Sequence, residues 1–441
     1  MAFYATTRNI GGTCYNTLMI RITTLVGKGV QKAAQLRGGG SALPGLVVEK
    51  LDRHFLARTL QALPYGVVVV SGTNGKTTTT KMVVELLHSQ GLRVFTNRTG
   101  SNFTRGVAAA LLEATDSNGN LPADIAVVEL DEAHAVHFVR QVAPRYCLLL
   151  NVLRDQLDRF GEIDYTAQLL HTIATHTTHG IVINGDDPRL ARSEFRIDTT
   201  APIHYYGVSQ QLAALFPSDD SMRDGNSTPT SRQAAYDVEL HDMHDADITL
   251  RFDQHNHTIA LKLKGSYNAQ NAAGAVALTR CILGERCNDN AMLSALSNVE
   301  PAFGRGETVT IHGHPCELVL VKNPSGFRLS LASFDPSQAA TMIAINDQYA
   351  DGRDMSWLWD VDFDSLKSTG VAMVSGVRAF DMALRLQYDE VEAHHVVPDL
   401  KQALATFIAS NTDKPLRIYC TYTAMLALRH ELNNYTKVHA V

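Results

Sequence analysis

Val67-Val-Val-Val-Ser-Gly-Thr-Asn-Gly-Lys-Thr-Thr-Thr-Thr-Lys-Met82 is the stretch that decides the fold. Its four consecutive β-branched residues predict a strand that is buried on both faces. Gly72 and Gly75 supply a loop that can turn sharply and bring backbone N–H groups close to a ligand. Lys76 and Thr77 open a predicted helix, whose free amides and dipole favour a bound phosphate. The stretch therefore predicts a phosphate-binding loop.

The loop departs from the longer G-x-x-x-x-G-K-[ST] pattern, because Val70 stands where that pattern has its first glycine. Glycines between a strand and a helix can also serve packing alone. The dipeptide Lys76-Thr77, placed directly after the second glycine, favours phosphate binding over packing.

The composition is that of a globular protein of two or three domains. The chain has 441 residues, with 45% hydrophobic and 19% charged residues, and a net charge of −6. That charge gives no general attraction to nucleic acid, and no run approaches the roughly eighteen apolar residues of a membrane span. The six cysteines are scattered without a CxxC pair, which predicts reduced core thiols in a cytoplasmic protein, with no disulfide framework and no zinc site.

Strands and helices alternate after the phosphate loop. A helix is predicted at 106–114, and residues 237–264 alternate polar and apolar side chains like antiparallel strands. The buried strands are predicted at 91–96, 124–130, 146–152 and 180–187. This order predicts an α/β fold with a mostly parallel sheet, whose ligands bind at the carboxyl ends of the strands. Residues 209–233 are rich in Ser, Asp, Thr, Pro and Gly, and are expected to form a loop excursion.

A second, smaller Rossmann-like α/β block is predicted toward the C-terminus. Its strands are predicted at 317–321, 342–346, 371–375, 394–397 and 417–419. The expected organisation is therefore a basic helical segment at 1–45, a central phosphate-binding domain at 46–302, and a C-terminal domain at 303–441.

The N-terminal segment is basic. Residues 1–48 contain five basic residues and no acidic one, and apolar residues recur at roughly helical spacing from Leu18 to Val30. A signal peptide is not expected, since no clean apolar core and cleavage site follow the charges. A helix packed on the body of the protein and a surface helix near anionic lipid both remain open.

Glu129 is the first candidate metal ligand. It ends the predicted strand 124–130, beside Asp131 and Glu132, at the edge where ligands of a parallel sheet bind. Magnesium prefers hard oxygen ligands together with waters and phosphate oxygens, so Glu129 and Thr77 would serve. The alternative is a solvated acidic loop.

The compact Gly-Thr-Asn-Gly-Lys-Thr loop resembles that of the Mur ligase and folylpolyglutamate synthase superfamily. Two departures from the amino-acid-adding ligases follow it: Gln156 replaces a metal-binding His, and Gln168 is found where a carbamylated Lys is frequent. Asn268 and Asn271 match the superfamily's nucleotide-contacting helix start. The resemblance implies a set of residues that bind ATP, namely Gly72, Thr73, Asn74, Gly75, Lys76, Thr77, Thr78, Asn268, Asn271 and Arg305.

Three C-terminal segments are similar to the MurT family, the Mur-ligase-like subunits of lipid II isoglutaminyl synthase: 320–327, 346–360 and 375–385. Many members carry a four-cysteine zinc ribbon, but residues 205–240 contain no cysteine, so zinc is not expected. The resemblance implies amidation of the D-glutamate α-carboxylate of lipid II through an acyl phosphate, with ATP, Mg²⁺, Lys76 and Glu129. It places the enzyme in the cytoplasm, at the inner face of the membrane.

The ammonia is expected from a separate GatD-like glutaminase subunit in a heterodimer, because no cysteine lies in a nucleophile turn. The resemblance implies that an Asp of the C-terminal domain completes the partner's triad. Asp354 is the candidate, with Asp351 and Asp360 as runners-up and a helix cap as the structural alternative. Trp357 and Trp359 are either core residues or anchors of the partner interface. An amino-acid-adding ligase and a nucleotide-regulated scaffold are the two rival functions.

Overall fold

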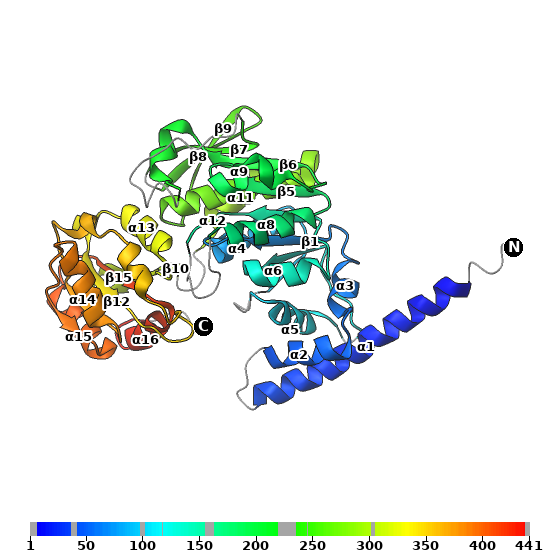
Figure 1. Cartoon of the computed structure of the whole chain (residues 1–441), viewed down its shortest axis with the longest axis horizontal. Coiled ribbons are helices and arrows are strands. Elements are labelled where there is room, and N and C mark those ends of the chain that lie inside the picture. The colour runs from blue at the N-terminus through cyan, green and yellow to red at the C-terminus, as the bar shows by residue number, and fades with distance from the viewer. Residues whose placement is uncertain are drawn as a thin grey trace.

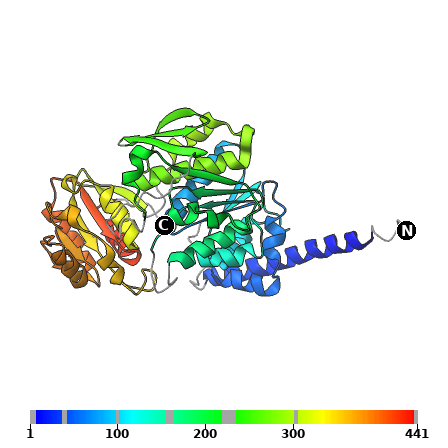
Figure 2. The same ribbon diagram turned by 45° about the horizontal axis from the view of Figure 1, so that its top comes forward.

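The computed structural model describes residues 7–36, 42–97, 102–116, 118–154, 163–218, 235–244, 246–300 and 305–436. Two α/β bodies stand side by side, and a long helix projects from the larger one (Figures 1 and 2). Gln156 and most of the predicted excursion at 209–233 lie outside the described residues. The structure describes no helix that combines the length and the apolar character needed to cross a membrane.

Three helices precede the first sheet. They are α1 (Thr7–Leu36), α2 (Ala42–Leu51) and α3 (Phe55–Leu60). Helix α1 packs against α2, α3 and α5, and its N-terminal half extends away from the body (Figure 1).

The larger sheet has nine strands in the order β2-β3-β1-β4-β5-β6-β7-β8-β9. Neighbours from β2 through β7 are parallel, and β8 and β9 continue the sheet antiparallel. The strands are β1 (Val67–Ser71), β2 (Val94–Thr96), β3 (Ile125–Glu129), β4 (Tyr146–Leu149), β5 (Gly180–Asn184), β6 (Ile203–Val208), β7 (Val238–His244), β8 (Asp247–Phe252) and β9 (His255–Ala260).

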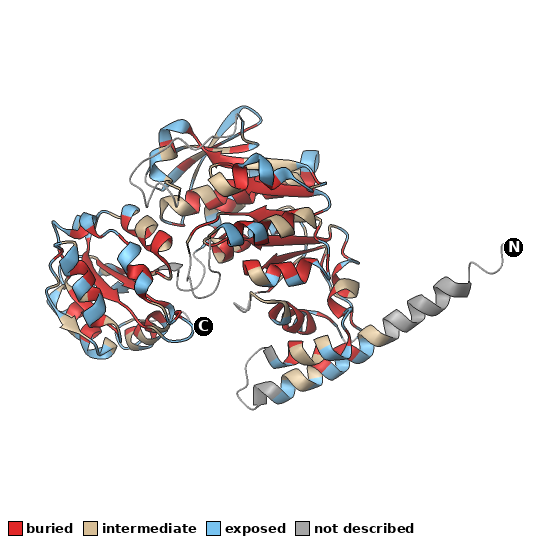
Figure 3. Ribbon diagram, viewed as in Figure 1, coloured by how far each residue is buried: buried red, intermediate tan, exposed pale blue. Residues whose placement is uncertain are grey.

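Helices cover both faces of this sheet. They are α4 (Lys76–Ser89), α5 (Thr104–Ala114), α6 (Glu132–Val139), α8 (Ile163–Thr175), α9 (Pro188–Ala191), α11 (Ser266–Leu283) and α12 (Asp289–Asn298), with 3₁₀ turns at Ser193–Arg196, Gln210–Leu215 and Gly284–Arg286. Successive side chains of a strand point to opposite faces, so β1 serves two cores. Val68 and Val70 pack under α4 and α11, whereas Val67 and Val69 pack under α5, α6 and α8. Both rows are buried, as Figure 3 shows for the central strands.

The smaller sheet has six strands in the order β10-β11-β15-β12-β13-β14, of which only β10 is antiparallel to its neighbour. The strands are β10 (Arg305–Ile311), β11 (His314–Leu320), β12 (Ala340–Ala344), β13 (Met373–Ser375), β14 (Val396–Val397) and β15 (Leu416–Cys420). The helices are α13 (Pro324–Ala332), α14 (Ala379–Tyr388), α15 (Leu400–Ser410) and α16 (Tyr422–Leu432), with 3₁₀ turns η4 (Pro336–Gln338), η5 (Ser356–Asp360) and η6 (Asp364–Leu366).

The predicted fold class is confirmed: a mostly parallel sheet with helices on both faces is joined to a smaller α/β sheet. Two strands escaped prediction. β6 is only partly buried along its first half, and β10 covers residues for which no strand was predicted. The division of the chain at residues 45 and 303 stays a prediction.

Candidate functional site

The phosphate loop runs from β1 into α4 and requires glycine at two positions. Gly72 has φ +137° and Gly75 has φ +86°, values that L side chains rarely adopt. A Cβ at Gly75 would lie 2.8 Å from the side-chain amide of Asn271. The loop therefore needs glycine for its backbone shape and for the close approach of α11.

Two side chains fasten the loop to the segment after β4. Thr73 Oγ1 accepts a hydrogen bond from the Leu153 backbone N–H at 3.0 Å and donates to the Leu153 carbonyl oxygen at 3.2 Å. The Asn151 side chain accepts from the Asn74 N–H at 2.8 Å and donates to the Asn74 carbonyl at 3.1 Å. These reciprocal pairs hold the loop in one conformation before any ligand binds, which lowers the cost of binding.

Lys76 lies buried at the start of α4. Its ammonium donates to the carbonyl oxygens of Gly72 at 2.6 Å and Thr73 at 3.3 Å, and forms an ion pair with Glu132 at 3.3 Å. The positive charge is thus held beneath the loop, beside the first turn of α4, whose N–H groups have no acceptor within the helix itself. Positive charge and helix N–H groups together form an anion site.

Thr77 and Glu129 meet at the carboxyl end of the sheet, as predicted. The Thr77 hydroxyl donates to Glu129 Oε1 at 2.8 Å. Asn97, at the end of β2, fixes the backbone of Glu129 by accepting from its N–H at 2.9 Å and donating to its carbonyl at 2.8 Å. A hydroxyl and a carboxylate held this close, next to a phosphate loop, fit the hard oxygen ligands of Mg²⁺.

Asp187, which follows β5, has a structural role: it binds the segment that follows the neighbouring strand β4. Its carboxylate accepts from the backbone N–H groups of Val152 at 2.7 Å, Arg189 at 2.9 Å and Leu190 at 3.1 Å. Burial raises the pKa of Asp187 to about 6, against the opposing effect of these donors. The side chain caps α9 and ties two strand ends together beside a pocket of about 70 Å³.

Asn268 and Asn271 open α11 on the other side of the loop. Asn268 Nδ2 donates to the Lys264 carbonyl at 2.7 Å, while Asn268 Oδ1 is buried and has no hydrogen-bond partner among the described residues. Asn268 lines a pocket of about 90 Å³ that Asn74, Gly75 and Thr78 also border. A buried acceptor facing a pocket fits a ligand that carries an N–H donor, as the adenine amino group does.

The smaller sheet contributes two residues that sequence reasoning missed. Asn323 exchanges hydrogen bonds with Asn74, at 3.0 Å and 3.3 Å between their side-chain amides. The Lys322 ammonium donates to the Thr73 carbonyl at 3.3 Å. Both residues directly follow β11 and lie within the segment 320–327. The tendency of ligands to bind at the carboxyl ends of parallel strands could have pointed to them.

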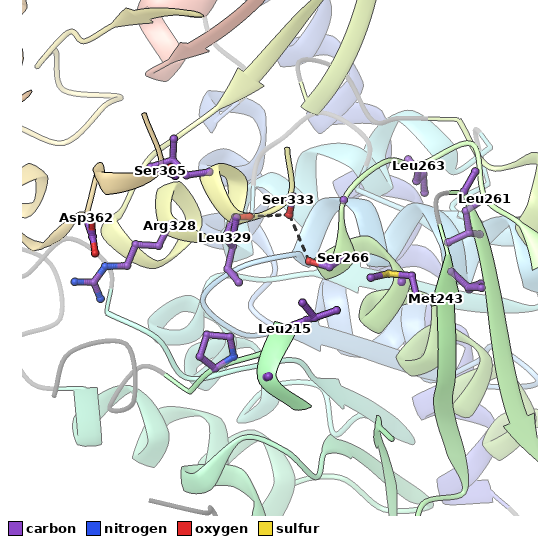
Figure 4. Close-up of a pocket in the computed structure, with 18 of the residues that line it drawn as sticks. Leu215, Met243, Leu261, Leu263, Ser266, Arg328, Leu329, Ser333, Asp362 and Ser365 are labelled. Carbon is purple, nitrogen blue, oxygen red and sulfur yellow. Dashed lines mark hydrogen bonds between the residues drawn. The ribbon is translucent and has the colours of Figure 1, made fainter. Parts of the chain in front are cut away.

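A larger cavity of about 520 Å³ opens between the two sheets near the start of α11 (Figure 4). Its lining is mostly apolar on the side of the larger sheet, whereas α13 and η6 contribute polar groups. Ser266 and Ser333 approach each other across it at 3.4 Å. The labelled lining residues include Leu215, Met243, Leu261, Leu263, Arg328 and Asp362.

Most of the predicted site residues come together. Residues 72–78, Glu129, Asn268 and Asn271 surround the start of α4, whereas the side chain of Arg305 lies outside the described residues. Glu132, Asn151 and Lys322 join them without having been predicted.

The predicted triad residue lies elsewhere, in the loop between β12 and η5. Asp354 is half-buried and accepts from the Ser356 N–H at 2.8 Å. Asp351 is buried and accepts from the hydroxyl of Thr423 at 2.5 Å and its N–H at 2.7 Å. Trp357 is buried against Phe327, with ring centroids 6.4 Å apart. Trp359, by contrast, is exposed, so the two tryptophans differ in environment.

Comparison with known proteins assigns both parts of the chain to known domain families. Residues 70–279 match the Mur ligase middle domain, and residues 320–425 match the MurT ligase C-terminal domain. The solved MurF ligase of Thermotoga maritima in complex with ADP superposes with a TM-score of 0.63 at 16% identity, covering 89% of this chain and 84% of that one. The two sheets and the phosphate loop between them thus define a protein of the Mur ligase fold.

Sequence relatives narrow this class further. The chain is 32% identical over 427 residues to a protein of Streptococcus pneumoniae (strain ATCC BAA-255 / R6) called lipid II isoglutaminyl synthase (glutamine-hydrolyzing) subunit MurT. The match covers 90% of this chain and 93% of that protein. A UDP-N-acetylmuramoylalanine–D-glutamate ligase of Burkholderia multivorans is 30% identical, but over only 52% of this chain and 47% of its own length. The chain belongs to the MurT family and is an enzyme of the ligase class.

Proposed function

We propose that this chain is the ATP-dependent subunit of a lipid II isoglutaminyl synthase. The observation that carries the proposal is the match to a MurT protein over nine-tenths of both chains, including the C-terminal domain. The amino-acid-adding ligase noted above matches only 52% of this chain and 47% of its own length, so this relative does not account for the whole chain.

The residues present fit ATP and magnesium. The anion site at the start of α4, the Thr77–Glu129 pair and the unpartnered carbonyl of Asn268 offer groups for phosphate, metal and base. When bound at Thr77 and Glu129, Mg²⁺ would supply charge neutralisation on the phosphate oxygens. Lys76 would neutralise the transferring phosphoryl group, and Arg305 would contact the nucleotide from the smaller domain.

The proposed reaction has two steps. An oxygen of the D-glutamate α-carboxylate attacks the terminal phosphorus of ATP, the bond to ADP breaks, and an acyl phosphate forms. Ammonia then attacks the acyl carbon, loses a proton and expels phosphate, which leaves D-isoglutamine. The chain's contribution is to position the reactants and stabilise charge, which is the main source of catalysis in phosphoryl transfer.

The ammonia would come from a separate glutaminase subunit of the GatD kind. A glutaminase needs a reactive thiolate, and burial raises the pKa of Cys147 and of Cys316 to about 12. Cys287 has a pKa raised to about 11, again by burial. These three thiols stay protonated at neutral pH. A nucleophile on another chain is supported by them together with the sequence, in which no cysteine lies in a nucleophile turn.

Asp354 is proposed to orient the partner's catalytic histidine. Hydrogen bonds from the Ser356 side chain and backbone lower the pKa of Asp354, so its carboxylate is charged at neutral pH. Asp351 is already held by Thr423, which disfavours it for this role. Asp360 is exposed at the end of η5 and remains the second candidate.

The test combines the purified chain and its glutaminase partner with ATP, glutamine and lipid II, and follows the product by mass spectrometry. The proposal expects the small mass decrease of a carboxylic acid becoming a primary amide. A gain of a whole amino-acid residue would instead identify an amino-acid-adding ligase. A complete lack of ATP turnover would favour a nucleotide-regulated scaffold.

A further inference from the structure

Helix α1 buries its polar face. Thr23, Thr24 and Gly27 are buried against the neighbouring helices. A Cβ at Gly27 would lie 2.7 Å from a methyl carbon of Leu112 and 2.9 Å from one of Val48, so glycine permits close contact with α5 and α2. These small and polar residues share the inner face of the helix with Ile20, which is partly buried against the core.

The outer face of α1 is apolar. Ile22, Leu25 and Val26 are 47%, 58% and 43% exposed. Their spacing of three and four residues places them on one stripe of the helix. A surface helix ordinarily turns its apolar stripe toward the core and its polar residues toward water. In α1, Ile22, Leu25 and Val26 face away from the core while Thr23 and Thr24 are buried, so packing within the described part of the chain does not account for this stripe.

Basic residues line one flank of the stripe. Arg21, Lys28 and Lys32 follow one another at intervals of seven and four residues, which keeps them in one row along the helix. Arg21 and Lys32 are exposed, whereas Lys28 donates to the Thr115 carbonyl. The first 48 residues contain no acid, although the whole chain has a net charge of −6.

We propose that the outer face of α1 docks on an anionic lipid surface. Ile22, Leu25 and Val26 enter the boundary between headgroups and acyl chains, while Arg21 and Lys32 contact lipid phosphates. A narrow apolar stripe flanked by cations matches an anionic bilayer, whereas an apolar partner protein would leave these charges without counterparts. The exposed side chains of this stripe and its two flanking cations leave the described outer face accessible to a flat surface.

The inference deepens the proposed function, because a lipid-linked substrate requires an enzyme that works at the bilayer. Lipid binding is measured without substrate, ATP or partner, so the result does not depend on the amidation activity. Lys76→Met is expected to abolish ATP turnover and leave lipid binding unchanged. Failure of the lipid-binding inference can therefore be distinguished from failure of the proposed amidation function.

The experiment is cosedimentation of the full chain with vesicles of equimolar phosphatidylglycerol and phosphatidylcholine, or of phosphatidylcholine alone. We expect binding to the anionic vesicles, weakened about tenfold or more by Leu25→Glu/Val26→Glu and also reduced by Arg21→Glu/Lys32→Glu. Ile197→Glu is the matched control, since Ile197 is as exposed as Leu25 but lies on the central body. It should bind as the wild type does.

Three results would overturn the inference. They are an absence of wild-type binding, equal binding to neutral vesicles, and wild-type binding by Leu25→Glu/Val26→Glu. If the wild type instead forms a dimer that this double variant dissociates, without binding vesicles, the stripe contacts a second copy of the chain. Thermal melting verifies that the α1 variants and Ile197→Glu are folded, which is expected because these substituted side chains are exposed.

Discussion

Removal of the Lys76 charge should destabilise the protein as well as inactivate it. The side chains of Lys76 and Glu132 are 8% and 2% exposed, and their charged atoms are 3.3 Å apart. At an effective dielectric constant of about 20, such a pair attracts by about 5 kcal/mol. Lys76→Met leaves Glu132 buried without this ionic partner, and the loss of one member of a buried pair costs about 3–5 kcal/mol.

The double variant Lys76→Met/Glu132→Gln separates the two roles of Lys76. Removing both charges should restore the free energy of unfolding to within about 1 kcal/mol of the wild type, because no buried charge then lacks a partner. ATP turnover should remain at least about a thousandfold lower, because the group that neutralises the phosphoryl oxygens is still missing. Urea unfolding measures the first quantity and phosphate release measures the second.

Either of two outcomes would contradict the two roles assigned to Lys76. A Lys76→Met protein as stable as the wild type would show that the ion pair does not stabilise the fold. Recovery of ATP turnover in the double variant would show that Lys76 acts only by holding Glu132. Glu132→Gln alone is the matched control, and it should cost about 3 kcal/mol, the low end of the range for a buried pair that loses one member, since the Lys76 ammonium loses its ionic partner but keeps its two carbonyl acceptors.

Three further predictions follow from individual contacts. Glu129→Gln should lower ATP turnover about a hundredfold or more and raise the Mg²⁺ concentration needed for half-maximal rate, with little change in stability; an unchanged Mg²⁺ titration would contradict the metal assignment. Asp354→Asn should reduce glutamine hydrolysis by the assembled complex while ATP binding survives, and Asp360→Asn should not; normal hydrolysis in the first variant would remove Asp354 from the triad. The hydrogen bond from His204 to Asp237 raises the pKa of His204 to about 10, above its unfolded value near 6.5, so the stabilisation is complete below about pH 6.5 and is lost as pH rises toward 10. After allowance for solvent screening, the stabilisation from this hydrogen bond is about 1 kcal/mol. Urea unfolding of His204→Gln should therefore show a free energy of unfolding that depends less on pH above about pH 6.5 than that of the wild type.

The sequence predicted the parts of the site that are local. A run of β-branched residues, two glycines and Lys76-Thr77 lie within one short stretch, so the strand, loop and helix could be derived together. Glu129 was found because parallel strands end at one edge of a sheet, and β3 lies next to β1 there.

The contacts that the sequence did not reveal join distant segments. The amide pair between Asn74 and Asn323 spans 249 residues, and no periodic pattern points to it. The ion pair of Lys76 selects Glu132 from three neighbouring acids, and this choice depends on how α6 packs. β6 was missed because its first half is only partly buried, so its hydrophobic pattern is weak.

The most direct test of the account follows oxygen through the reaction. Lipid II carrying a heavy-oxygen label in the α-carboxylate of its D-glutamate is amidated by the chain and its glutaminase partner with ATP, and the released phosphate is analysed by mass spectrometry. Activation through an acyl phosphate predicts one labelled oxygen in phosphate for each amide formed. Amide formation with unlabelled phosphate would contradict the central claim that this chain uses ATP to activate a carboxylate.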